Sequence, residues 1–214
     1  MNTDDVNPSR RRGRPALPPE RIVGAALDLV DDEGADALSM RTLAQRLGSG
    51  TATLYRHFAG RTELVAMVVD RMLGEVSWEH AVGLAWDEVC ISFAQNMFDA
   101  LRRHGKVAPL LVGHVPMGPN AMAQREFLLS VLLDSGFPAQ TAARIYATLS
   151  RYVLGFAMQV CAESQVNDAQ VETAFQRLDP ARYPATTAAA DQLPVPLADE
   201  FDFGLRSLVA GLAR

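Results

Sequence analysis

The sequence predicts an all-α protein in which a small N-terminal helical domain precedes a larger helical one. Three observations support this prediction. Apolar residues recur at helical spacing in most segments from residue 19 onward, no segment alternates strictly between apolar and polar residues, and glycine or proline marks the expected helix ends. The chain has 214 residues, 49% hydrophobic and 21% charged, which is ordinary for a folded globular protein.

The first helix is predicted over residues 19–33. Pro18 and Pro19 favour a helix start, because proline is tolerated where the backbone N–H would lack an intrahelical partner. Apolar residues then recur every three or four positions, and Gly34 suits the end of the helix. Residues 1–17 are polar and then rich in arginine, so we expect them to form a disordered basic arm.

Residues 38–64 predict two short helices that meet at a glycine turn and lead into a fourth helix. Ser39 can cap a helix that ends near Leu47, and the next helix is expected over residues 51–57. Ala44 would let the two helices approach closely, and Gly48 suits the positive φ of a tight turn. This arrangement matches a DNA-binding helix–turn–helix, and an ordinary antiparallel helix pair is the simpler alternative.

Apolar anchors are expected in the third and fourth helices. Leu54, together with Tyr55 and Phe58, can hold the third helix against a core. The fourth helix opens at Gly60, and its inward-facing side chains are expected to be Leu64, Met67, Val68 and Met72.

Further helices are expected over residues 86–103, 120–135, 138–165, 168–178 and 197–212. Residues 179–196 contain four prolines and predict a flexible loop. We therefore expect three parts: the arm at 1–17, a helix–turn–helix domain at 18–65, and a larger helical domain at 66–214.

Charge is distributed unevenly along the chain. Residues 38–64 hold four arginines and a single acid, Glu63, whereas the whole chain has a formal net charge of −5 and a pI near 5.4. A cationic segment in an acidic protein predicts that this one face meets a polyanion such as DNA.

Other function classes find little support. P-loop, dinucleotide-binding, nucleophile-elbow and HExxH strings are absent and the four histidines are dispersed, so we do not expect an enzyme. Cys90 and Cys161 lie far apart and predict neither a disulfide framework nor a zinc site. No apolar run could span a bilayer and no secretory signal is recognisable. We therefore expect a cytoplasmic protein with no membrane, metal or cofactor.

The helix–turn–helix segment resembles the DNA-binding domain of the tetracycline-repressor (TetR) family, most specifically in the string TLYRHF and the RTEL that follows. Residues 138–165, with YVLGFAMQ, and residues 199–213 resemble the two dimer-forming helices of the tetracycline-repressor C-terminal subclass. The resemblance covers nearly the whole chain from residue 20. It implies a dimeric, ligand-responsive regulator of transcription, most simply a repressor that binds a palindromic operator through helix 51–57.

The resemblance also implies roles for single residues in DNA binding. The third helix would enter the major groove and present Thr51, Ala52, Tyr55 and Arg56. Arg41 matches a base-reading arginine, and an arginine there can bond guanine in two places. Phosphate contacts are expected from Ser39, Thr53, His57 and Arg61.

Each of these roles has an alternative that involves no DNA. Ser39 could serve only as a helix cap, Tyr55 could be partly in the core, and Arg46 could be a solvated charge. For Arg41 and Arg61 the charge asymmetry favours DNA contact.

The resemblance places a pocket for a small, largely apolar effector between the fourth helix and residues 86–103, 106–116 and 138–160. For each candidate, ordinary core packing is the competing explanation. The candidate lining residues are Phe93, Met97, Phe98, His104, Leu111, His114, Met117, Phe127, Tyr152, Phe156 and Gln159.

One departure from the tetracycline repressors bears on the effector. Leu111 and Gln159 align where those repressors hold a histidine and a glutamate associated with the drug's Mg²⁺. Leucine cannot ligate a hard cation, and a neutral amide is a weak substitute for a carboxylate. A tetracycline–magnesium complex is therefore not the expected ligand.

The expected partners are double-stranded operator DNA, a small-molecule effector and a second copy of the chain. Helices 138–165 and 197–212 carry apolar stripes that two subunits can bury together in a four-helix interface, and packing inside one subunit is the alternative. An architectural DNA binder without an effector is the competing function, and its mark would be salt-sensitive binding with little sequence preference.

Deleting residues 1–15 should weaken operator binding and flatten its salt dependence. Arginines at 10, 11, 12 and 14 flank a glycine, and such an arm fits a narrow minor groove. Operator affinity measured at several salt concentrations checks this. Equal affinity of the full and shortened chains at every concentration would assign the arm to solubility alone.

Overall fold

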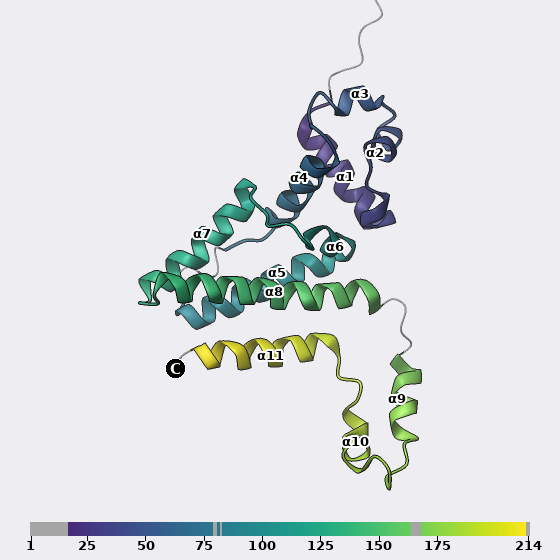
Figure 1. Ribbon diagram of the computed structural model, residues 1–214, viewed down its shortest axis with the longest axis vertical. Coiled ribbons are helices and arrows are strands. Elements are labelled where there is room, and N and C mark those ends of the chain that lie inside the picture. The colour runs from purple at the N-terminus through teal and green to yellow at the C-terminus, as the bar shows by residue number, and fades with distance from the viewer. Residues whose placement is uncertain (1–16, 79–80, 82, 164–167, 213–214) are drawn as a thin grey trace, which may run out of the picture.

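The computed structural model describes residues 17–78, 81, 83–163 and 168–212. All regular structure in these ranges is helical (Figure 1). The longer helices are α1 (Pro19–Glu33), α4 (Arg61–Leu73), α5 (Trp86–Arg103), α7 (Pro119–Asp134), α8 (Ala139–Glu163), α9 (Asp168–Gln176) and α11 (Leu197–Leu212). The shorter ones are η1 (Ala35–Ala37), α2 (Met40–Arg46), α3 (Thr51–Leu54), η3 (Gly105–Val107), α6 (Ala108–Leu111), α10 (Pro184–Ala188) and η4 (Ala190–Gln192).

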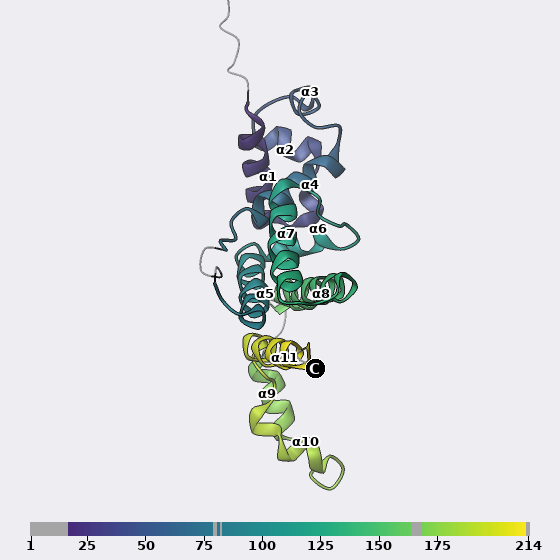
Figure 2. The same ribbon diagram turned by 90° about the vertical axis from the view of Figure 1, so that its left-hand side faces the viewer.

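The molecule is elongated and has three regions (Figures 1 and 2). α1, α2, α3 and α4 form a head at one end, and α5 to α8 with α11 form a body. α9 and α10 extend from the far side of the body. From here on, the arm means this C-terminal extension and not the N-terminal arm predicted for residues 1–17. In Figure 2, α5, α8 and α11 are all seen nearly end-on, so their axes run in roughly the same direction. The all-α prediction is confirmed.

The head is built on α1, whose range matches the prediction. Its apolar stripe is buried from Ile22 to Val30, mainly against α4. The helix ends at Gly34, where φ is +95°, a backbone conformation that side chains with a Cβ rarely adopt.

The helix–turn–helix forms as expected at the turn and differs in the length of its second helix. The Ser39 hydroxyl accepts a hydrogen bond from the Thr42 N–H at 3.0 Å and caps α2, while Gly48 has φ of +58°. α3 covers only residues 51–54, because the N–H of His57 bonds the carbonyl three residues back and tightens the chain into a turn. This turn brings Phe58 into the core beside Leu54.

α4 is shared by the head and the body. Six of its apolar side chains are buried, and it contacts α1 on one side and α5, α6 and α7 on the other. Met67 was expected to face inward and is instead 38% exposed, so the apolar spacing assigned one residue too many to the buried side of α4. The predicted boundary between residues 65 and 66 falls inside this helix.

The core of the body lies among α5, α7, α8 and α11. α8 buries one side chain per turn from Ala142 to Ala157, and α11 buries Phe201, Leu205 and Val209. Aromatic rings fill the space between α5, α8 and α11, with the ring centroids of Phe98 and Phe201 stacked 4.0 Å apart. Much of the apolar stripe assigned to dimerisation therefore packs inside one subunit.

Residues 179–196 were expected to form a flexible loop, and this expectation is wrong because part of the stretch is helical. This stretch contains α10 and η4, and η4 packs against α9 with Ala190 buried. Pro184 is the first residue of α10, where proline favours a helix, and the alanines that follow are strong helix formers. Proline is frequent in loops and also favours the first turn of a helix, so the four prolines of this stretch are compatible with either structure.

A buried carboxylate joins α4 to α7. Asp70 is 8% exposed and accepts hydrogen bonds from the backbone N–H groups of Ala121 at 2.9 Å and Asn120 at 3.3 Å. It thereby satisfies the free N–H groups at the start of α7. The Gln124 amide donates to the Leu73 carbonyl at 2.5 Å. A side chain at Gly118 would clash with the Asp70 carboxyl group.

Gly118→Ala should lower the free energy of unfolding by about 1–3 kcal/mol, because the added methyl displaces Asp70 from the start of α7. Gly24→Ala is the matched control. Its Cβ meets nothing within 4 Å in the middle of α1, so it should stabilise by about 0.5–1 kcal/mol. Urea unfolding measures both. Equal stability of Gly118→Ala and the parent would contradict the described α4–α7 junction.

Candidate nucleic-acid interface and candidate ligand cavity

α3 presents a polar surface at the end of the head. Thr51, Ala52, Tyr55 and Arg56 are exposed on α3 and the turn that follows it, and Tyr55 is 57% exposed. Leu54 faces the opposite way and is fully buried. Figure 1 places α3 at the tip of the head, away from α5, α8 and α11. The predicted base-facing residues therefore share one accessible surface, and Tyr55 is not part of the core.

The four arginines of this region have different surroundings. Arg41 and Arg56 are exposed, and neither has a hydrogen-bond or ion-pair partner among the described residues. Arg46 hydrogen-bonds Asp32 and lies 3.6 Å from Glu33, so its charge is paired with the end of α1. Arg41 and Arg56 thus supply most of the unpaired positive charge beside α3.

Arg61 has a structural role that the sequence did not indicate. Its Nε donates to the Leu38 carbonyl at 2.7 Å and its Nη2 to the Ala35 carbonyl at 3.2 Å. These bonds tie the start of α4 to the segment between α1 and α2. No sequence signal marks the carbonyls that a distant arginine will reach, because they depend on tertiary packing. Contact of Arg61 with phosphate stays a prediction.

The other residues expected at phosphates flank α3. Thr53 and His57 are half-buried, and the Ser39 hydroxyl is also bonded to the Thr42 hydroxyl at 2.7 Å. Ser39 thus caps α2, and its contact with a DNA phosphate remains a prediction.

The residues expected to line the effector pocket do not converge on one cavity. Phe93, Phe127, Tyr152 and Phe156 lie in the aromatic core of the body, where Phe93 stacks on Trp78 with centroids 5.4 Å apart. The Tyr152 hydroxyl donates to the Phe201 carbonyl at 2.8 Å. Met97 and Leu111 are half-buried beside this core, whereas His114, Met117 and Gln159 are exposed.

His104, another candidate, bridges two acids. Its Nδ1 lies 2.7 Å from the Asp31 carboxylate and its Nε2 lies 3.0 Å from the Glu75 carboxylate. The two carboxylates contact opposite sides of the ring and do not converge on one point, as metal ligands must.

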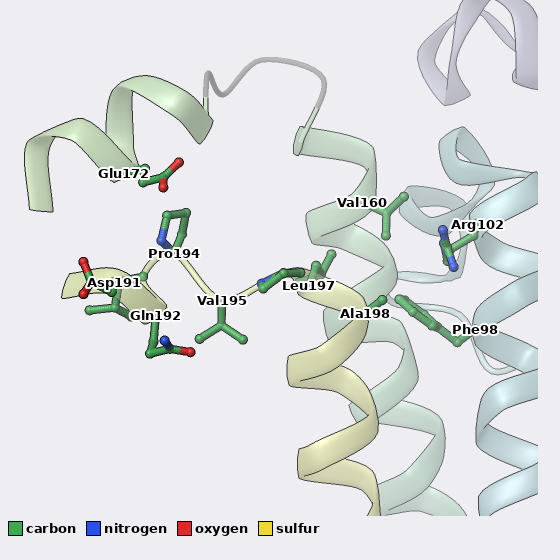
Figure 3. Close-up of a pocket in the computed structure, with 12 residues that line it drawn as sticks. Phe98, Arg102, Val160, Glu172, Asp191, Gln192, Pro194, Val195, Leu197 and Ala198 are labelled. Atoms are coloured by element: carbon green, nitrogen blue, oxygen red, sulfur yellow. The ribbon is translucent and has the colours of Figure 1, made fainter. Parts of the chain in front are cut away.

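A cavity of about 630 Å³ opens between the body and the arm. Figure 3 shows Phe98, Arg102 and Val160 on its body side, and Glu172, Asp191 and Gln192 on its arm side. Prolines and apolar residues of the 193–198 segment complete the lining. Of the eleven predicted pocket residues, Phe98 alone belongs to it. The rest of the lining was not predicted, because residues 179–196 were expected to be a loop.

Reactive groups are scarce in the described part of the chain. No cluster of three or more His, Cys, Asp or Glu residues there could hold a metal ion, and no described helix is long and apolar enough to cross a membrane. Cys90 is buried, and burial raises the pKa of its thiol to about 12, so it remains an unreactive thiol. The side chain of Cys161 lies outside the described residues.

Family models match both regions of the chain. The model for bacterial regulatory proteins of the tetR family matches residues 22–68, and that for the tetracyclin repressor-like C-terminal domain matches residues 82–214. An HTH-type transcriptional regulator of Saccharopolyspora erythraea is 33% identical over 208 residues, covering 94% of this chain and 87% of the relative. The class A tetracycline repressor of transposon 1721 in Escherichia coli is 30% identical over 203 residues, with 92% and 91% covered.

Solved structures agree with the sequence relatives. The TetR family protein ActR of Streptomyces coelicolor in complex with actinorhodin superposes with a TM-score of 0.82 at 30% identity, covering 94% of this chain and 97% of ActR. These similarities confirm the expectation of a regulator rather than an enzyme. The exposed helix–turn–helix surface, the shared helix α4 and the matches over both regions together show that this chain belongs to the TetR family of bacterial transcriptional regulators.

Proposed function

We propose that this protein is a dimeric repressor that binds a palindromic operator through α3 and leaves it when a small molecule binds the body. The observation that carries the proposal is the α3 surface, where Tyr55, Arg56 and Arg41 are exposed and unpaired at the tip of an otherwise acidic protein. A DNA-binding regulator works where the chromosome is, so we place it in the cytoplasm. We propose residues 18–65 as the DNA-binding domain and residues 66–214 as the effector and dimerisation domain.

Exposed faces of α8 and α11 support a dimer. Phe203 on α11 is 76% exposed, a large cost for an aromatic ring left in water. A Cβ at Gly155 of α8 or Gly211 of α11 would meet nothing within this chain, so both backbones can approach a partner closely. A symmetric pair of such helices would hold two α3 helices for operator half-sites about 34 Å apart.

The effector is proposed to be a largely apolar, aromatic molecule. ActR has been crystallised in complex with actinorhodin. The body of this chain is rich in aromatic side chains, which suit an apolar, aromatic ligand. Leu111 offers no ligand for Mg²⁺ and the neutral amide of Gln159 only a weak one, which separates this body from a tetracycline–magnesium site. We propose that the effector binds among the predicted pocket residues in the body. The cavity beside Arg102 is the second candidate site.

The proposed function is tested by comparing the protein's affinity for DNA from upstream of its own gene with its affinity for a scrambled duplex. Arg41→Ala should relax the preference for one half-site base pair by about 1–3 kcal/mol. Arg61→Ala should weaken all sequences alike and also lower stability, because its two carbonyl partners lose their donor. Mobility-shift titrations on the matched and mutated duplexes measure this. Uniform losses in both variants would overturn the assigned roles, and equal binding of scrambled DNA would favour an architectural binder.

A thermal-shift screen that begins with actinorhodin should identify ligands that stabilise the protein and release the upstream DNA. A ligand at 100 times its Kd stabilises the folded state by about 2.7 kcal/mol. Phe156→Leu should reduce the shift if the core-lining residues bind it, whereas Arg102→Met should do so if the cavity between body and arm is used. Stabilising ligands that never release DNA would contradict the proposed response.

A further inference from the structure

His104 lies where three parts of the molecule meet. It follows the last turn of α5 in the body, Asp31 belongs to the last turn of α1 in the head, and Glu75 follows the end of α4. The end of α1 also contacts η3, the segment directly after His104. One imidazole ring thus joins the body to the head and to the helix that the two share.

The bridge is only partly accessible to water. The His104 side chain is 15% exposed and those of Asp31 and Glu75 are 29% and 37% exposed. The second carboxylate oxygen of Asp31 is buried and has no hydrogen-bond partner among the described residues. A carboxylate placed in this way depends on His104 for its neutralisation, because an unpaired buried charge is costly.

We propose that His104 couples the body to the DNA-binding head: its ring, when protonated, clamps the ends of α1 and α4 to the end of α5, and operator binding changes this clamp. The inference rests on the proposed function, because the head must bind DNA for the coupling to matter. His104 acts as a positioning residue and touches no DNA.

Protonation sets the strength of the clamp. Burial lowers the pKa of His104, but the hydrogen bonds with Glu75 and Asp31 raise it by more, so the net pKa lies above the ordinary value. A neutral ring can donate to only one of the two carboxylates, whereas the cation donates to both. The clamp is therefore complete below about pH 6.5 and is lost as the pH rises through the raised pKa.

Other charged groups near the bridge are bound elsewhere. Lys106 of η3 donates to the Asp32 carbonyl at 2.6 Å, and the Asp32 carboxylate pairs with Arg46 of α2. On the side of α8, a Cβ at Gly105 would lie 4.0 Å from the apolar side chain of Val160. Among the described residues, Asp31 and Glu75 are thus the acids bonded to His104.

The histidine titration of the full-length protein, followed by NMR with and without operator duplex, tests the coupling. The His104 midpoint should lie above the ordinary value of an imidazole, and Glu75→Gln should lower it. Adding the upstream duplex that shifts in the mobility assay should move the His104 midpoint by about 0.7 pH unit or more, the fivefold lower end of usual allosteric coupling. By reciprocity, operator affinity then changes at least fivefold across the titration.

Two controls separate coupling from other effects. Glu126→Gln removes an exposed acid on α7 and should leave the His104 midpoint unchanged. His114 in the body reports any general effect of the DNA charge, which is screened within about 8 Å at physiological salt. A His104 midpoint that is equal with and without bound duplex overturns the coupling and leaves the proposed function standing. Failure to bind the upstream duplex at all overturns both.

Discussion

The burial of α4 from both sides is the constraint on which the rest of the structure depends. Leu64, Val65 and Val68 complete a core with α1, and the C-terminal half of the same helix packs on α5, α6 and α7. Protein interiors are close-packed, so a helix held on both faces cannot shift in one core without disturbing the other. Head and body are therefore mechanically connected, although we propose that the head binds DNA and the body binds the effector.

Polar contacts fix the C-terminal end of α4 more tightly than packing alone. Asp70 and Leu73 bond the first turns of α7, and Glu75 bonds His104 at the end of α5. The first two contacts join α4 to α7, and the third joins the end of α4 to the end of α5. A change in the relative positions of α5 and α7 would thus be felt at α4 and, through the Arg61 bonds to Ala35 and Leu38, at the segment that leads into α2. These contacts form a continuous path from the body to the part of the head that precedes α2.

Much of the fold was predictable because periodicity and helix caps are local. The ranges of α1, α5 and α11 agree with the predictions within a residue or so, as does the turn at Gly48. In the arm, α9 was predicted, whereas α10 and η4 were missed because proline both ends and starts helices, so the context of Pro184 was ambiguous. The residues that the family resemblance assigns to the DNA-facing side of α3 are exposed, since exposure on a one-turn helix follows from its single buried anchor, Leu54.

The parts of the sites that escaped prediction depend on distant contacts. Nothing in the sequence links His104 to Asp31 or Arg61 to Ala35, because these pairs meet only after the helices have packed. Charge counting likewise overestimated the free cations beside α3, since Arg46 is paired with Asp32 and Glu33. The family resemblance places the eleven pocket candidates around the centre of the body, and apolar and aromatic residues there fill cores as readily as they line cavities.

Hydrogen exchange of the full-length protein with and without operator duplex tests the central claim most directly, namely that one shared helix carries events between α3 and the body. The account predicts that DNA bound at α3 slows exchange at residues 51–57 and also at residues 70–75 and 119–124, far from the duplex. Slowed exchange confined to residues 39–61, with the end of α4 and the start of α7 unchanged, would contradict it.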